Sequence, residues 1–206
     1  MTFAAGRFAR PPECARYHYV VPNYKRNFAT GATFFFTVVT KDRHPVFVDE
    51  STVELLRRAL RAVNDLRPFT IDAAVILPDH LHMIWTLPPN DGNFDKRWSA
   101  IKSRFTRDWL AAGGREAAIS DRSARKRHRG VWQHRFFEHT IRNEEDLVQH
   151  IDYIHFNPVK HGLVSRPVDW RWSSIHHYIA EGILPPDWGT SGVPPCLDRI
   201  NPDMLE

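Results

Sequence analysis

Two histidines two residues apart form the first group that could do chemistry. His80 and His82 flank Leu81 in a run of β-favouring residues. Side chains alternate between the two faces of a sheet, so both imidazoles project from one face while Leu81 points into the core. Two imidazoles placed in this way can share one cation. Ordinary polar residues on a solvated sheet face have the same spacing, so the pair alone leaves both interpretations open.

The second group is a polar helix face, on which a tyrosine is more often an ordinary surface residue than a catalytic one. Tyr153 and Asn157 lie one turn apart, however, so a phenol and an amide oxygen could both reach a cation held by the histidines. A nucleophile and a third metal ligand would then be coupled. The polar residues of this face, at positions i, i+4, i+7 and i+11, are Asp146, His150, Tyr153 and Asn157. An apolar stripe of Leu147, Ile151 and Ile154 lies beside them.

The segments that must position these groups predict an interleaved set of strands and helices. Pro78-Asp79 separates two β-rich runs tightly, which favours a hairpin and an antiparallel α+β sheet over a doubly wound one. Ser51 and Glu54 match a capping box at a helix start, and Pro158 is expected to stop the last long helix. We expect strands at 33–40, 69–77, 80–87 and about 135–141, and helices at 52–66, about 95–112 and about 143–157.

The composition indicates one domain with a mild preference for a polyanion. The 206 residues are 42% hydrophobic, which suffices for a single core, and the formal charge is +4. Residues 1–30 are expected to form an N-terminal arm, residues 31–180 the domain and residues 181–206 a C-terminal tail. Within the domain, the stretch 113–130 is rich in Gly, Ser and Arg and is predicted to be a basic loop.

Cysteine usage and hydropathy argue against several other classes of protein. Cys14 and Cys196 lie far apart, so neither a zinc ribbon nor a disulfide framework is indicated, and a reducing cytoplasm fits best. The longest apolar run, 34–39, is much shorter than the roughly 18 to 20 residues that span a bilayer. The N-terminus lacks the apolar region of a secretion signal. A cytoplasmic protein with no membrane partner is therefore expected.

Taken in order, the motifs resemble a known family. A His-hydrophobic-His motif followed by a helix tyrosine is similar to the HUH endonuclease superfamily in its single-tyrosine transposase branch. More narrowly, the chain resembles the REP-associated tyrosine transposases. Phe156 departs from the pattern, because many relatives are expected to have a tyrosine there. The features that carry the resemblance extend from about Tyr24 to Tyr178: Tyr24-Lys25-Arg26, Thr33 to Val39, Pro78 to His82, Trp132-Gln133, Tyr153 to Gly162, and Trp172-Ser173-Ser174.

This resemblance implies a fold, a site and a reaction. The fold is a ferredoxin-like antiparallel sheet with helices on one face, whose central strand carries the histidine pair. His80 and His82 are implied as metal ligands, Asn157 as the residue that completes the site, and Tyr153 as the nucleophile. Bound Mg²⁺ or Mn²⁺ would polarise the scissile phosphate of single-stranded DNA. The products would be a 5′-phosphotyrosine and a free 3′-hydroxyl, and a second strand could then be joined to the covalent intermediate.

The partner implied by the resemblance is single-stranded or hairpin DNA of the REP type, in a bacterial cytoplasm and associated with the nucleoid. Homo-oligomerisation stays open. His150 and His155 are further candidates for proton handling, although each is more often a helix-surface histidine. The basic residues predicted to contact DNA phosphates lie in the arm, the second helix and the basic loop: Arg16, Lys25, Arg26, Lys102, Arg104, Arg107, Arg125, Lys126, Arg127 and Arg129.

Two other functions compete with this one. A protein of the same fold that no longer cuts could bind palindromic repeats, but the intact set of His80, His82, Tyr153 and Asn157 argues against it. A metal-dependent hydrolase of a small phosphoester would use the histidines and leave Tyr153 structural. The basic arm and loop would then lack a purpose. A covalent protein–DNA adduct would distinguish the transferase from both alternatives.

Overall fold

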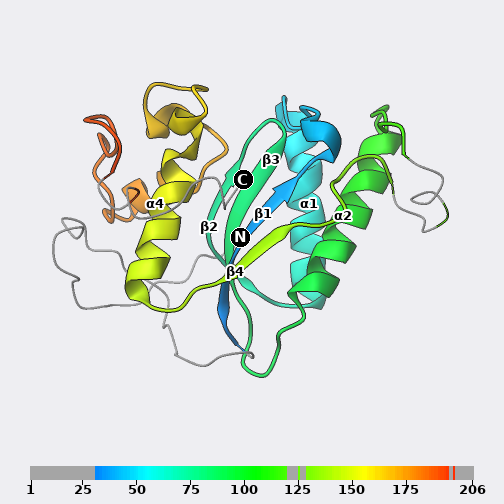
Figure 1. The fold of residues 1–206 in the computed structure, drawn as a ribbon, viewed down its shortest axis with the longest axis horizontal. Helices are drawn as coiled ribbons and strands as arrows, with labels where there is room; N and C mark the ends of the chain where they lie inside the picture. Colours follow the sequence, from blue (N-terminus) through cyan, green and yellow to red (C-terminus); the bar gives the residue numbers. More distant parts are fainter. Residues whose placement is uncertain (1–30, 120–124, 126–128, 195–196, 198–206) are drawn as a thin grey trace.

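The computed structural model describes residues 31–119, 125, 129–194 and 197 (Figure 1). The predicted N-terminal arm and the middle of the basic loop lie outside these residues, so no structure is assigned to them. The strands are β1 (Thr33–Val39), β2 (Thr70–Ile76), β3 (His80–Thr86) and β4 (Phe137–Thr140). The helices are α1 (Glu50–Leu66), α2 (Phe94–Ala111), α4 (Glu144–Lys160) and α5 (Ile175–Ala180), with short 3₁₀ turns at Lys41–Arg43 and Pro167–Asp169.

The four strands form one antiparallel sheet in the order β2-β3-β1-β4. Together with the chain order β1-α1-β2-β3-α2-β4, this is the ferredoxin-like arrangement, in which each crossover helix joins two non-adjacent strands. Pro78-Asp79 makes the tight β2–β3 connection, since the Leu77 amide donates to the carbonyl of His80 at 2.8 Å. The predicted α+β class, the antiparallel sheet and the hairpin are confirmed.

The helices cover both faces of the sheet, so the expectation of helices on one face is wrong. α1 and α2 bury their apolar sides against Phe36, Leu81 and Trp85 on one face. α4 lies on the other face, against Phe35 and Ile84 (Figure 1). Right-handed crossovers place α1 and α2 together. α4 follows the last strand and is not a crossover, so it is free to cover the apolar residues of the second face.

The start of α1 differs from its predicted capping box. Asp49 is the N-cap, and its carboxylate accepts from the Thr52 amide at 2.8 Å. Ser51 lies inside the helix and donates its hydroxyl to the same carboxylate at 2.6 Å, while Glu54 pairs with Arg61 on the helix surface. An ionised carboxylate is a stronger acceptor than a hydroxyl and also interacts favourably with the helix dipole, so Asp49 is the better cap.

Helix α4 continues through Pro158, where the sequence predicted that it would stop. The helix ends at Lys160, and the amides of His161 and Leu163 donate to the carbonyls of Asn157 and Pro158 at 3.0 and 2.9 Å. A proline inside a helix forfeits one backbone hydrogen bond. Pro158 is buried, and the packing of this last turn against the rest of the fold offsets that loss. The extra turn extends the helix face that carries Tyr153.

The described part of the C-terminal tail packs on the domain. Leu184 and Trp188 are buried in the same apolar cluster as α4 and α5. How the chain divides into arm, domain and tail stays a prediction, because the whole arm and part of the tail lie outside the described residues. No helix in the described part is long and apolar enough to cross a bilayer.

Candidate active site

Strand β3 presents the two histidines to the space beneath α4. His80 and His82 are 1% and 0% exposed, and their ring centroids lie 5.0 Å apart. Leu81 between them points to the opposite face, as the alternation predicts. The alternative of a solvated sheet face is therefore wrong, since two buried imidazoles share one side of a central strand. Burying polar rings is costly unless they have a specific partner or role.

The Nδ1 atom of each histidine is held by a neighbouring oxygen. His82 Nδ1 lies 2.9 Å from the Thr37 hydroxyl on β1, and His80 Nδ1 lies 2.6 Å from the Asp79 carboxylate. Arg43 in turn pairs with Asp79 at 3.2 Å. Burial raises the pKa of Asp79, but the hydrogen bond and the charge of His80 outweigh it and leave the pKa below its usual value. Such contacts orient a histidine and leave its buried Nε2 atom as the position that could bind a metal ion.

Two ring contacts join α4 and the residue after it to the histidines of β3. The Tyr153 ring lies 5.2 Å from His82, and the His161 ring, just after the helix, lies 5.0 Å from His80. Asn157 is one turn beyond Tyr153 and one turn before His161, so its side chain falls in the same stretch of the α4–β3 interface. The sequence-predicted phenol, amide and imidazoles are therefore brought to one region of the fold.

The side chain of Asn157 provides a test of whether a cation fits here. Asn157 is 0% exposed, and neither its amide oxygen nor its amide nitrogen has a hydrogen-bond partner among the described residues. A buried amide without partners costs about 1–3 kcal/mol, which a bound group can recover. One amide oxygen and two imidazole nitrogens form a donor set that accepts a divalent first-row cation. The residues present therefore fit a metal ion.

Lys160 is a site residue that the sequence reasoning missed. Its ammonium donates to the Tyr153 hydroxyl at 3.3 Å and lies 5.1 Å from the centre of the phenol ring. A cation beside a phenol oxygen stabilises the phenolate relative to the phenol. The signal in the sequence was the i, i+7 spacing from Tyr153, which places both on one helix face. It was hidden because Pro158 suggested that the helix ended first.

A second cluster near the N-terminus of α4 could also hold a metal ion. Ligand atoms of His139, Asp146 and His150 all lie within 4.8 Å of one another. Asp146 accepts from His139 Nε2 at 2.9 Å and from the Arg142 amide at 2.9 Å. Burial raises the pKa of Asp146, yet the hydrogen bonds from His139 and His150 outweigh it and hold the pKa well below its usual range. A cation here would have to displace donors already in place, so His80, His82 and Asn157 are the better candidate for a metal site.

The two histidines considered for proton handling have structural contacts. His150 Nδ1 lies 2.7 Å from the Asp146 carbonyl oxygen, and its ring stacks on His139 at 4.7 Å. His155 is 0% exposed in the core, with Nε2 2.8 Å from the Ser174 hydroxyl. Burial lowers the pKa of His155 to about 3, so this ring is neutral at physiological pH. In the described part of the chain, these two residues hydrogen-bond to Asp146 and Ser174 and not to Tyr153.

The predicted DNA-binding residues are only partly within the described chain. Lys102, Arg107 and Arg129 line a groove between α2 and the segment before β4. Arg104 lies on α2 but does not line this groove, and Arg125 is exposed. The others lie outside the described residues: Arg16, Lys25, Arg26, Lys126 and Arg127.

Comparison with known proteins agrees with the geometry. The family model described as "Transposase IS200 like" matches residues 28–157. A REP-associated tyrosine transposase of Escherichia coli (strain K12) is 41% identical over 165 residues, which cover 80% of this chain and 89% of the relative. A protein of Haemophilus influenzae (strain ATCC 51907 / DSM 11121 / KW20 / Rd), provisionally given the same description, is 40% identical over 168 residues, 81% of this chain and 93% of that protein.

A solved structure extends the match to three dimensions. It is the structure of a REP-associated tyrosine transposase bound to a REP hairpin, with a TM-score of 0.66 and 40% sequence identity. The match covers 82% of this chain and 91% of that one. The fold, the family model and both relatives point to the same conclusion, and the family name supports a transposase-type DNA enzyme. The chain belongs to the REP-associated tyrosine transposases, within the IS200-like transposase family.

Proposed function

We propose that this protein is a metal-dependent endonuclease and strand transferase that acts on REP-type hairpin DNA with Tyr153 as its nucleophile. The observation that carries the proposal is the position of the Tyr153 ring, which lies 5.2 Å from His82 under α4. A tyrosine that served only as an amphipathic surface residue would not be 3% exposed beside two buried histidines and a lysine ammonium. A reactive phenol needs such neighbours.

The reaction follows from the groups around the phenol. The Tyr153 oxygen attacks the scissile phosphorus, a P–O bond to tyrosine forms, and the P–O3′ bond breaks. The phenolic proton leaves to solvent, and the 3′ oxygen takes up a proton to become a hydroxyl. Lys160 stabilises the phenolate that attacks, since its ammonium already donates to this oxygen. The 5′-phosphotyrosine conserves the ester, so a 3′-hydroxyl of a second strand can attack it and rejoin DNA without ATP.

His80, His82 and Asn157 would hold the cation, with Mg²⁺ or Mn²⁺ as the proposed occupants. The support comes from the donor set and from the Asn157 amide, whose oxygen and nitrogen are buried without hydrogen-bond partners in the described chain. When bound, the ion would withdraw charge from a non-bridging phosphate oxygen and orient the phosphate for in-line attack. Thr37 and Asp79 would keep the imidazoles turned toward it.

Hairpin DNA as the substrate is supported by the relative whose structure contains a REP hairpin, at 40% identity. The chain's formal charge of +4 also favours a polyanionic partner such as DNA. A cytoplasmic, nucleoid-associated location is proposed on the same basis.

The experiment compares wild-type protein with Tyr153→Phe on labelled hairpin oligonucleotides from the genome that encodes the chain. Each reaction contains Mn²⁺ or EDTA and is run on a denaturing gel. We expect a covalent adduct with wild type and Mn²⁺ only. Tyr153→Phe should lose the adduct and bind the hairpin within a few-fold of wild type, because only one hydroxyl is removed. If Tyr153→Phe still forms the adduct, the assignment of the nucleophile is wrong.

Two results would favour the other functions. Tight hairpin binding without an adduct, across the repeats tested, would favour a DNA-binding protein of the same fold that does not cut. Metal-dependent hydrolysis of a small phosphoester that survives Tyr153→Phe would favour a hydrolase.

A further inference from the structure

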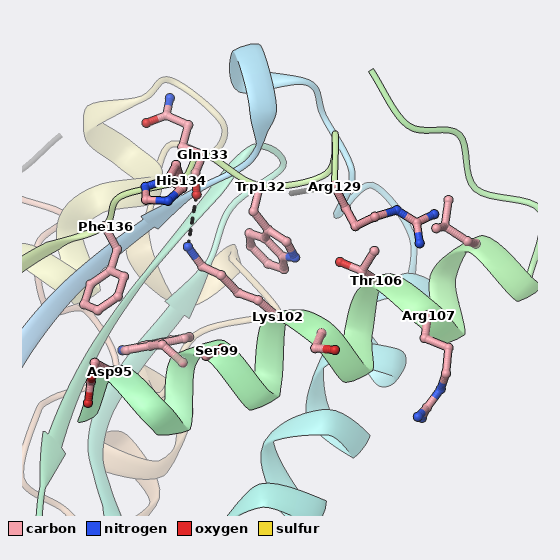
Figure 2. Close-up of a pocket in the computed structure, with 13 residues that line it drawn as sticks. Asp95, Ser99, Lys102, Thr106, Arg107, Arg129, Trp132, Gln133, His134 and Phe136 are labelled. Atoms are coloured by element: carbon pink, nitrogen blue, oxygen red, sulfur yellow. Dashed lines mark hydrogen bonds between the residues drawn. The ribbon is translucent and has the colours of Figure 1, made fainter. Parts of the chain in front are cut away.

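A groove of about 700 Å³ lies on the face of the sheet opposite the Tyr153 site (Figure 2). One wall is α2, which contributes Ser99, Lys102 and Thr106. The other wall is the segment that leads into β4, with Trp132, His134 and Phe136 among its side chains. The groove therefore combines a lysine, hydroxyl groups and aromatic rings, which is the composition of a surface that binds single-stranded nucleic acid.

Lys102 spans the groove and contacts its opposite wall. Figure 2 shows its side chain crossing from α2 toward the opposite wall, where the ammonium donates to the Gln133 carbonyl at 3.2 Å. The ammonium also lies 5.7 and 5.3 Å from the ring centres of Trp132 and Phe136. Among the described residues, no carboxylate forms a salt bridge with it. Burial lowers the pKa of Lys102 to about 8, so the group is still mainly a cation at neutral pH.

A cation desolvated in this way is more stable beside an anion. The other basic residues of the groove are less available. Arg129 already pairs with Glu116 at 2.6 Å, and the Arg107 side chain points away from the opposite wall (Figure 2). Asp95 at one end is the acidic residue among those lining the groove. Lys102 is therefore the charge for which an anionic ligand would supply the missing partner.

The groove continues around the edge of the sheet toward the Tyr153 site. A second hollow of about 520 Å³ shares His134 and Phe136 with it and extends along β4 to Glu138. β4 is an edge strand, so a polymer can pass around it. On the far side, the Phe137 ring lies 6.4 Å from Phe35, which itself lies 6.0 Å from Tyr153. Phe136, just before β4, thus faces the groove, while Phe137, the first residue of β4, contacts the side of the sheet that carries Tyr153.

We infer that this groove holds a single-stranded segment of the DNA substrate, with Lys102 paired to a phosphate and with Phe136 and His134 in contact with bases. The segment would leave the Tyr153 site, pass around β4 and lie along α2. The inference rests on the proposed function, because it takes DNA as the substrate. It adds a strand-binding site on the side of the sheet away from the nucleophile.

The test measures binding by fluorescence anisotropy for a REP-type hairpin with and without a single-stranded extension. Extensions are placed at the 5′ or the 3′ end, and a third set carries abasic nucleotides. Lys102→Met keeps the apolar stem and removes the charge. Lys96→Met is the matched control, because Lys96 is exposed on the same helix and does not line the groove. Phe136→Leu keeps a bulky apolar side chain and removes the ring.

We expect one of the extensions to tighten wild-type binding roughly ten-fold, the effect of about one stacked base with its phosphate. Lys102→Met should remove most of this gain on normal and abasic extensions and lower the salt dependence of log K by about 0.7. Phe136→Leu should remove the gain only on extensions that carry bases. Lys96→Met should retain the gain and bind the blunt hairpin like wild type.

Equal wild-type affinity for blunt and extended hairpins would overturn the inference, and so would an unchanged gain in Lys102→Met. Covalent adduct formation on the same DNA separates this failure from failure of the proposed function. An adduct without any extension-dependent gain means that the enzyme acts as proposed and the groove has another role. A gain that depends on Lys102, without an adduct, means that the groove binds DNA in a protein that does not cut.

Discussion

Asp72 is a buried carboxyl group whose ionisation should control the stability of this fold. Its side chain is 3% exposed on β2, at the register shift between Ile71 and Ala73. One carboxyl oxygen accepts from the Thr86 hydroxyl at 2.7 Å, and the other has no hydrogen-bond partner among the described residues. The Tyr178 hydroxyl donates to the Asp72 backbone carbonyl at 2.9 Å and does not neutralise the carboxyl group. A carboxylate at this position is poorly compensated.

Burial raises the pKa of Asp72 from 3.8 to about 7, although the Thr86 hydrogen bond acts in the opposite direction. In the unfolded chain the group ionises near pH 3.8, whereas in the folded protein it keeps its proton until about pH 7. Its contribution to stability is therefore fully present below pH 3.8 and is lost as the pH rises to about 7. The interval is roughly 3 pKa units at about 1.4 kcal/mol each, so the loss at pH 8 approaches about 4 kcal/mol.

The substitution Asp72→Asn should remove this pH dependence. Asparagine has nearly the same shape, can accept from Thr86 through its amide oxygen, and does not ionise. We expect the variant and the wild type to have similar free energies of unfolding near pH 4. At pH 8 the variant should be more stable by up to about 4 kcal/mol, because only the wild type then buries an ionised carboxylate.

Urea denaturation at several pH values between 4 and 8, followed by tryptophan fluorescence, measures the difference between the two proteins. Taking the difference cancels the contributions of other ionisable groups. Asp65→Asn is the control, because Asp65 is exposed on α1, and its difference from wild type should stay small at every pH. If the difference for Asp72→Asn does not change with pH, the reasoning about the buried carboxyl group is wrong.

Three further predictions concern the site and its support. Thr37→Val removes the hydroxyl that lies 2.9 Å from His82 Nδ1, so the Mn²⁺ concentration for half-maximal adduct formation should rise about 10- to 100-fold; unchanged metal dependence would contradict this. Lys160→Met removes the cation at the Tyr153 hydroxyl, so adduct formation in single-turnover reactions should slow at pH 7 and recover as the pH rises; an equal deficit at pH 9 would contradict the role in stabilising the phenolate. Asp146→Asn weakens the contacts to His139 and His150 and should cost about 1–3 kcal/mol at pH 7 in urea denaturation. Burial raises the pKa of Asp146, but these hydrogen bonds outweigh it and lower the pKa in the folded protein. The contribution of Asp146 to stability is therefore present above pH 3.8, the pKa of the unfolded chain, and is lost at lower pH. The difference in unfolding free energy between wild type and Asp146→Asn should accordingly shrink in acid.

Local patterns in the sequence were sufficient for the elements that carry the site. Alternation placed Leu81 on one face and both histidines on the other, because side-chain direction in a strand depends only on position. Helical spacing likewise placed Asp146, His150, Tyr153 and Asn157 on one side of α4, which buries all of them. The Pro78-Asp79 turn identified the hairpin. These features depend on backbone geometry over a few residues, so they can be predicted from the sequence.

Other features depended on packing between segments far apart in the chain. The sequence predicted that α4 would end at Pro158, but Pro158 is buried and the helix continues to Lys160, which brings that ammonium to the Tyr153 hydroxyl. The contact of Thr37 with His82 arises only because β1 pairs with β3 in one register.

The sequence by itself determined which groups could react and the strand or helix face from which each projects, since these follow from local backbone periodicity. Only the tertiary structure decided that α4 covers the face opposite α1 and α2, and that the imidazoles, phenol and amide share one buried interface. It also decided that Lys102 is half-buried in a groove, with its ammonium near two aromatic rings. Local patterns contain no information on which buried surface each helix will cover, because that choice depends on the apolar area that the whole fold must remove from water.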